Sequence, residues 1–185
     1  MIGLAIGHSR RGDSGAWTVG ANSVSEHQFN SRLVPLITPL LNVPYKVYDD
    51  YQASSYVGAI NYVSRQMKQD GVDACIELHF NAAGPTATGH EWLHWETSTG
   101  GKKLASKLKE AMENEFPDLR SRGTKPRSKG QRGALFLRKT PVYACIAEPF
   151  FGSSVNDVDL ITANLDKLAK VYADGVNNYY SDEAP

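Results

Sequence analysis

Short apolar runs alternate along the chain with segments of helical periodicity. The runs are rich in β-branched or aliphatic residues and are bounded by Gly, Pro, Asp or Asn, which is typical of strands. We therefore predict six strands, over residues 2–6, 45–48, 74–80, 92–95, 134–137 and 142–147. In the intervening segments apolar residues recur at helical spacing. This pattern predicts four helices, over residues 23 to about 41, 54–69, 99–116 and 157–179.

Strands that alternate with helices favour an α/β fold. We expect a single domain whose six-stranded sheet is mostly parallel (mixed), with helices on both faces. The domain is predicted to span residues 1–180, and residues 181–185 to form a tail or the start of a linker. Pro35 and Pro39 predict a bend or an early end in the first helix, because each removes a backbone donor. Residues 117–133 are basic, polar and rich in Gly and Pro, which predicts a long exposed loop.

Composition narrows the class of protein only slightly. The chain has 185 residues, 41% of them hydrophobic, which is enough for one compact core. Its 20 basic and 20 acidic residues cancel, so we expect no nucleic-acid or membrane partner, and we expect a monomer. The first apolar run ends after six residues and is followed by basic ones, the wrong order for a secretory signal. We therefore expect synthesis in the cytoplasm, with Cys75 and Cys145 buried and reduced.

Four residues able to carry chemistry follow strands or open a helix: His8, Glu26, His79 and Glu148. Carboxyl ends of strands are where α/β domains place their sites. Taken singly, each has a structural explanation, since a lone histidine is usually structural and the helix dipole favours an early glutamate. Glu148 ends an apolar run, where a charge is costly unless it is paired, lies in a cleft or binds metal. Two imidazoles and a carboxylate are the ligands of many catalytic zinc sites, and a second carboxylate can then act as acid and base.

The segments around these residues resemble a known family. The order GHSRRGDSGA, SVSEHQFN, IELHFNA and TPVYACIAEPFF is similar to the catalytic domains of zinc-dependent N-acetylmuramoyl-L-alanine amidases, above all those of bacteriophage endolysins. The resemblance covers nearly the whole chain. It implies that His8, Glu26 and His79 bind Zn²⁺ and that Glu148 is the catalytic acid and base.

The resemblance also assigns weaker roles and has departures. It implies that Asn81 and the Gly12–Ala16 turn shape the site. Many relatives have Asp-Pro where this chain has Ala5 and Ile6, and many have Ser where this chain has Glu77. Because side chains alternate along a strand, Glu77 faces the same side as the histidine two residues later. It is either a partner that orients the imidazole or an accidental neighbour.

The function implied by the resemblance is zinc-dependent hydrolysis of peptidoglycan. The bond would be the amide between N-acetylmuramic acid and the first L-alanine of the stem peptide. Without a signal, such an enzyme would act on the cell wall only after the membrane is breached, as a phage endolysin does. The hypothesis requires His8 and His79 to lie within about 8 Å of each other.

Two other functions compete with this one. HEWLH, residues 90–94, matches the pattern of zinc peptidases, which works only on a helix. Trp92 and its neighbours favour a strand, on which His90 and His94 would lie about 13 Å apart, too far for one metal. The other alternative is a non-catalytic module in which residues 117–133 grip an anionic polymer. That module would leave the four candidate residues unexplained.

Overall fold

The strands form one sheet. The computed structural model describes residues 1–84 and 86–182. Within this part of the chain the sheet has the order β2-β1-β3-β6-β4-β5. The strands are β1 (Ile2–Ile6), β2 (Tyr45–Tyr48), β3 (Ala74–Leu78), β4 (His90–Trp95), β5 (Ser121–Arg127) and β6 (Tyr143–Glu148). The helices are α1 (Glu26–Ile37), α2 (Tyr56–Asp70), α3 (Thr99–Glu115), α4 (Ala134–Lys139), α5 (Val155–Thr162) and α6 (Leu165–Ser181), with a 3₁₀ turn η1 (Thr38–Leu40).

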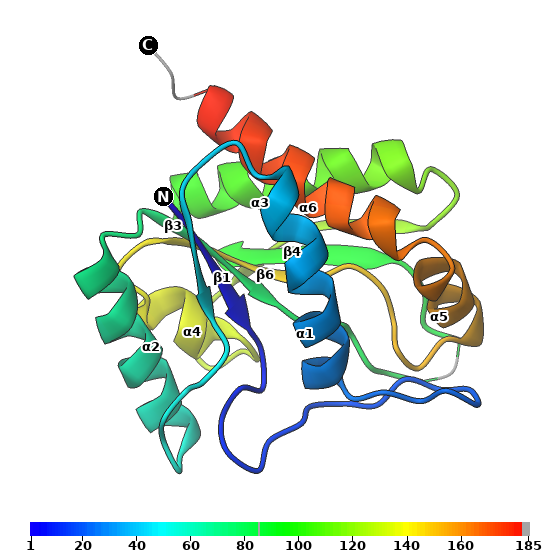
Figure 1. Ribbon diagram of the computed structural model, residues 1–185, viewed down its shortest axis with the longest axis horizontal. Coiled ribbons are helices and arrows are strands. Elements are labelled where there is room, and N and C mark those ends of the chain that lie inside the picture. Colours follow the sequence, from blue (N-terminus) through cyan, green and yellow to red (C-terminus); the bar gives the residue numbers. More distant parts are fainter. Residues whose placement is uncertain (85, 183–185) are drawn as a thin grey trace.

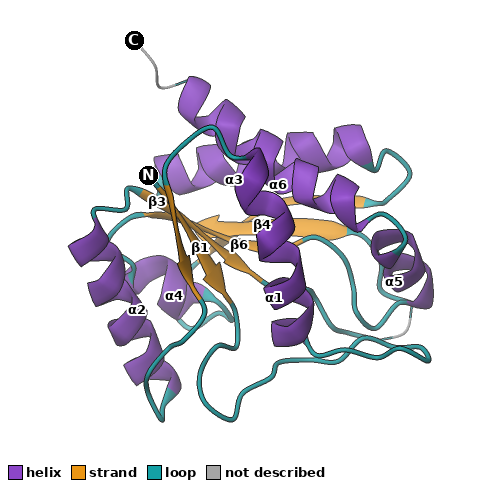
Figure 2. Ribbon diagram, in the orientation of Figure 1, coloured by secondary structure: helices purple, strands orange, loops and turns teal. Residues whose placement is uncertain are grey.

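The sheet is mixed, as predicted. Strands β2, β1, β3 and β6 run parallel, β4 is antiparallel to β6, and β5 is parallel to β4. Helices α1, α3 and α6 lie over one face, and α2 and α4 lie over the other (Figures 1 and 2). Because the three central parallel strands β1, β3 and β6 are neighbours, their carboxyl ends meet at one edge.

Two apolar cores, one on each face, hold these layers together. The larger core joins the sheet to α1, α3 and α6, and the fully buried rings of Trp92 and Tyr172 pack edge to face within it. The smaller core lies under α2 and α4. Cys75 and Cys145 are free and buried, as predicted. In residues 1–84 and 86–182, no helix is both long and apolar enough to cross a bilayer.

The sequence prediction was wrong for one strand and for part of one loop. Residues 134–137, predicted as a strand, belong to helix α4, and the predicted loop over 117–133 contains strand β5. A short apolar run carries no period that separates strand from helix, and Gly133 begins α4 with a left-handed backbone. Strand β5 lies at the edge of the sheet, where charged residues and a proline such as Pro126 are tolerated.

Helix boundaries differ from the prediction at two places. The predicted helix 157–179 is two helices, because the backbone of Asn164 is not helical (φ −132°, ψ 41°); its side-chain amide donates to the Leu160 carbonyl at the end of α5 (2.8 Å). The first helix ends early, as predicted, and Pro39 lies in the following 3₁₀ turn. Helix α6 extends through Ser181, the first residue of the predicted tail; residues 183–185 of that prediction lie outside the described ranges.

Candidate active site

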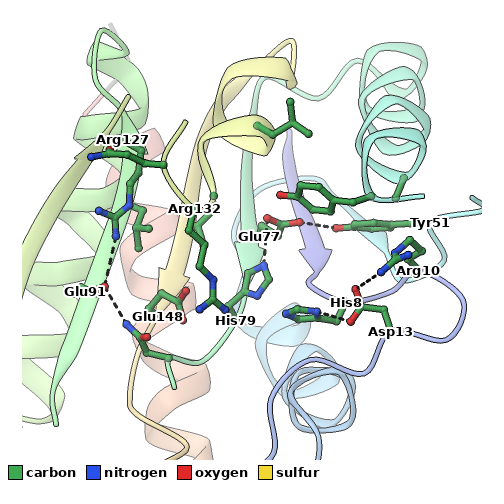
Figure 3. A pocket seen from close by; sticks show the side chains of 18 residues that line it. His8, Arg10, Asp13, Tyr51, Glu77, His79, Glu91, Arg127, Arg132 and Glu148 are labelled. Atoms are coloured by element: carbon green, nitrogen blue, oxygen red, sulfur yellow. Dashed lines mark hydrogen bonds and ion pairs between the residues drawn. The ribbon is translucent and has the colours of Figure 1, made fainter. Parts of the chain in front are cut away.

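The four residues singled out in the sequence come together at one edge of the sheet. His8 follows β1, His79 follows β3 and Glu148 ends β6, and these strands are adjacent. All three side chains line a pocket of about 330 Å³ (Figure 3). Glu26, the first residue of α1, is 1% exposed and contacts both imidazoles.

His8, Glu26 and His79 form a compact cluster of metal-ligating groups. One ligand atom from each lies within 4.8 Å of the others. Glu26 Oε2 is 3.3 Å from His8 Nε2, and Glu26 Oε1 is 2.6 Å from His79 Nδ1. The two ring centroids are 5.0 Å apart, well within the distance that the shared-metal hypothesis requires. The cluster therefore has the donor set and spacing of a single-cation site.

The other nitrogen of each imidazole faces a second carboxylate. His8 Nδ1 is 2.9 Å from Asp13 Oδ1, and His79 Nε2 is 3.2 Å from Glu77 Oε2 (Figure 3). The Tyr51 hydroxyl in turn donates to Glu77 Oε1 (3.4 Å). Carboxylates in this position fix the tautomer and the orientation of a ligating histidine. Glu77 is thus in direct contact with His79, the arrangement expected of a partner that orients the imidazole.

The metal-facing atoms fit a bound cation. His8 Nε2 is buried and has no hydrogen-bond partner in the described residues. The Glu26 carboxylate accepts hydrogen bonds from the backbone N–H groups of Ala16 and Phe80, both 3.1 Å long. Burial opposes its charge, but the hydrogen bond with His79 and the contact with His8 outweigh this and hold the pKa of Glu26 well below its usual range. A divalent cation would bind both the ionised carboxylate and the ring nitrogen that has no hydrogen-bond partner in the described residues.

Two glycines make room for this packing. A Cβ on Gly7 would lie 2.3 Å from the His79 ring, and one on Gly15 would lie 2.6 Å from the His8 ring. His8 itself has a positive φ of 61°, which side-chain-bearing residues rarely adopt. The glycine-rich segment after β1 is therefore required by contacts with the imidazoles, and such backbone strain is common at functional sites.

Glu148 differs from Glu26 in its surroundings. It ends β6, is half-buried and lines the pocket, and its Oε2 has no hydrogen-bond partner in the described chain. Burial raises the pKa of Glu148 to about 7. A carboxyl group that titrates near neutrality can both take and return a proton, which suits general acid and base catalysis.

The HEWLH segment is strand β4, so the two-histidine peptidase pattern does not apply to it. His90 is fully buried and accepts a hydrogen bond from the Trp92 indole (2.9 Å). Alternate residues of a strand face opposite sides, and Glu91 lines the active-site pocket instead. Glu91 was not among the predicted site residues, because in the sequence it stands out only as part of the peptidase pattern. Strand alternation was the signal that separates it from His90 and His94.

The opposite wall of the pocket contributes residues that the sequence did not mark. Arg127 on β5 and Arg132 before α4 line it together with Asn81, which the resemblance had placed at the site. Asn81 Nδ2 donates to Glu91 Oε1 (2.9 Å). The two arginines lie in the segment predicted to be an exposed loop, and the pairing of β5 with β4 brings Arg127 to the pocket.

Comparison with known proteins identifies the family. The sequence profile of the N-acetylmuramoyl-L-alanine amidases (Amidase_3) matches residues 2–178. This chain belongs to that family. Family membership and the site together indicate an amidase that hydrolyses an amide bond of peptidoglycan. No curated protein sequence matches the chain significantly.

Solved amidase structures share the fold over almost the whole chain. An N-acetylmuramoyl-L-alanine amidase from Clostridium difficile 630 is 21% identical, with a TM-score of 0.80 over 99% of this chain and 97% of that one. The catalytic domain of the CD27L endolysin, which targets Clostridia difficile, is 23% identical with a TM-score of 0.77, and 96% of each chain is covered. The CwlD amidase from Clostridioides difficile, solved in complex with the GerS lipoprotein, is 16% identical with a TM-score of 0.82 over 98% of each chain.

Proposed function

We propose that this amidase is zinc-dependent and cleaves the amide between N-acetylmuramic acid and the first L-alanine of the stem peptide. The observation that carries the proposal is the His8, Glu26 and His79 cluster beside Glu148 on one pocket, in a chain of the amidase family. Two imidazoles and one carboxylate are a ligand set of catalytic zinc sites that leave a position for water or substrate.

The residues divide the chemistry between holding the metal and moving a proton. His8 Nε2, a Glu26 oxygen and His79 Nδ1 would hold the zinc, while Asp13 and Glu77 keep the imidazoles oriented. Zinc, when bound, supplies a Lewis acid for the amide carbonyl and lowers the pKa of a water. Glu148 accepts a proton from the attacking water and returns it to the departing alanine nitrogen.

We further infer a lytic role, that of an endolysin from a bacteriophage, made in the cytoplasm and acting on the wall once the membrane is breached. Its support is the likeness in fold to an endolysin catalytic domain. Purified protein should clear a suspension of permeabilised cells, and its expression inside intact cells should not lyse them until the membrane is opened. Lysis of unbreached cells from within would contradict this role.

Mass spectrometry of digested peptidoglycan tests the bond. Zinc-loaded protein should release stem peptides with a new amino-terminal alanine and leave the glycan strands intact. New reducing sugar ends, or peptides cut beyond the alanine, would overturn the assignment.

Substitutions distinguish the residues that bind zinc from the residue that transfers the proton. Glu148→Ala should keep one zinc per chain while hydrolysis falls by about 100-fold or more, because only general acid and base catalysis is lost. His8→Ala should lose the zinc. His94→Ala is the matched control, since His94 lies on β4 outside the cluster, and it should keep both zinc and activity.

A further inference from the structure

The pocket wall opposite His8 carries an unusual arrangement of charge. Glu91 is buried there, and its own neighbours satisfy both of its oxygens. Oε1 accepts from Asn81 Nδ2 (2.9 Å) and lies 3.7 Å from Arg127 Nη2, and Oε2 accepts from Arg122 Nε (3.0 Å). Glu91 is thus paired closely with Arg122, which does not line the pocket, and only loosely with Arg127, which does.

The guanidinium of Arg127 has an N–H donor with no acceptor among the described residues. Its Nε is buried and has no hydrogen-bond partner among the described residues, and its contact with Glu91 is a longer ion pair through Nη2 alone. A guanidinium carries five N–H donors in a fixed planar fork. Because Arg127 lines the pocket, the unsatisfied part of this fork is available to a ligand.

Arg132 adds a second guanidinium, and it follows a turn that is held by two hydrogen bonds. The turn before α4 is closed by the Gln131 N–H donating to the Ser128 carbonyl (3.2 Å) and the Ser128 N–H donating to the Gln131 side chain (2.9 Å). Arg132 reaches from this turn toward the space between Glu148 and His79 (Figure 3). It has no hydrogen bond or ion pair to any residue in 1–84 or 86–182, although it is exposed and lines the pocket.

We propose that Arg127 and Arg132 form a subsite for a carboxylate of the stem peptide. The carboxylate is the α-carboxylate of the second stem residue, where this is D-glutamate linked through its γ-carboxyl. This inference rests on the proposed function, which puts the scissile amide at the His8, Glu26 and His79 cluster beside Glu148. The second residue is one residue beyond the new amino terminus, about 3.5 Å further along an extended chain. A planar guanidinium pair binds a carboxylate through charge-assisted, bidentate hydrogen bonds. Amidation of that carboxylate removes the charge that the subsite recognises.

Two matched ligands test the subsite without relying on turnover. L-Alanyl-D-glutamate with its γ-carboxyl blocked as the N-methylamide, and the same peptide with its α-carboxyl also amidated (the isoglutamine form), differ in one group and are titrated into the zinc-loaded protein by calorimetry. The wild-type protein should bind the acid at least about 10-fold more tightly than the amide, since a hydrogen-bonded charge contributes roughly this factor or more. In Arg132→Gln the ratio should fall toward one, mainly through weaker binding of the acid.

The same comparison is then made with muropeptide substrates that carry the free or the amidated residue. Arg132→Gln should lower kcat/KM about 10-fold on the acid and change it little on the amide. Arg138→Gln on α4 is the control, because Arg138 is exposed and does not line the pocket. Arg127→Gln should act in the same direction. If Arg127→Gln unfolds the protein because the contact with Glu91 is lost, Arg132→Gln alone tests the subsite.

The results separate failure of the subsite from failure of the proposed function. Equal binding of acid and amide by the wild-type protein, or an equal loss on both in Arg132→Gln, overturns the carboxylate subsite while amide cleavage stands. If instead the wild-type protein exposes no amino-terminal alanine in peptidoglycan, the proposed function fails. The calorimetric ratio then still decides whether the two arginines recognise a carboxylate.

Discussion

At the scale of single residues, the site is a chain of carboxylates and imidazoles. Each histidine of the cluster lies between Glu26 and a further carboxylate, Asp13 for His8 and Glu77 for His79. The Tyr51 hydroxyl extends this chain by one more hydrogen bond. Ligand geometry therefore depends on residues that do not themselves face the metal.

Glu77 supplies a test of this dependence. Glu77→Ala removes the acceptor at His79 Nε2, so the imidazole loses its fixed tautomer, and zinc affinity should fall by about 10- to 100-fold. Glu77→Gln should recover part of the loss, because its amide oxygen still accepts a hydrogen bond. Competition with a chromophoric chelator measures the affinity. Glu96→Ala, on an exposed residue just after β4, should leave it unchanged.

Glu148 predicts a pH dependence of stability in the metal-free protein. Burial raises its pKa to about 7, above the ordinary value of 4.5, so the native state favours the protonated form. The neutral carboxyl contributes its full stabilisation at pH values below the ordinary pKa of 4.5. This stabilisation is lost as the pH rises through the native-state pKa of about 7. Relative to the wild-type protein, Glu148→Gln should thus gain about 3 kcal/mol in free energy of unfolding between pH 4.5 and 7.5. A constant difference across urea titrations in this range would contradict the raised pKa.

At the scale of elements, helices α3 and α6 approach closely through a glycine. A Cβ on Gly175 of α6 would lie 2.7 Å from Leu108 Cδ2 and 2.9 Å from Leu108 Cα on α3. The second atom belongs to the backbone, so it moves only if the helix moves. The absence of a side chain at Gly175 sets how near α6 lies to α3 and to the sheet.

Gly175→Ala should therefore destabilise the protein although alanine is the better helix former. Overpacking costs about 1–3 kcal/mol and helix propensity returns about 1 kcal/mol, so the expected net loss is up to about 2 kcal/mol. Urea unfolding followed by circular dichroism measures it. Lys167→Ala, at an exposed position of the same helix, is the control and should change stability by less than about 0.5 kcal/mol. A Gly175 variant more stable than the wild-type protein would show that the helices can separate at no cost.

At the scale of the whole molecule, metal binding joins distant parts of the chain. His8, Glu26 and His79 come from the ends of two strands and the start of a helix on one face of the sheet. These groups are assembled only in the folded protein, so a cation that binds them stabilises the native state by mass action.

Removal of zinc should lower the Tm by about 10 °C. Zinc at about 1,000 times its dissociation constant adds about 4 kcal/mol, and a chain of this size shifts by about 2–4 °C for each kcal/mol. Scanning calorimetry with and without a chelator gives the shift. His8→Ala should show almost none, because it no longer holds the metal. A wild-type Tm that the chelator leaves unchanged would argue against the zinc site.

Sequence alone determined the alternation of strands and helices, the mixed α/β class and the four side chains at element ends. It succeeded because side-chain type and local periodicity are properties of neighbouring residues. His8, His79 and Glu148 all stand where an apolar run stops, and parallel strands necessarily bring such ends to one edge. The buried Glu26 was found through its place in the family pattern, since the helix dipole alone explains an early glutamate.

Only the tertiary structure decided what the remaining wall of the pocket contains. Residues 121–127 are polar and basic, and they form a strand because β4 offers an open edge, a contact between segments distant in sequence. The apolar run at 134–137 becomes helix because its side chains pack on the sheet beside α2. These two outcomes bring Arg127 and Arg132 to the pocket. Strand pairing and packing are non-local, so no pattern within either segment contains the information that settles them.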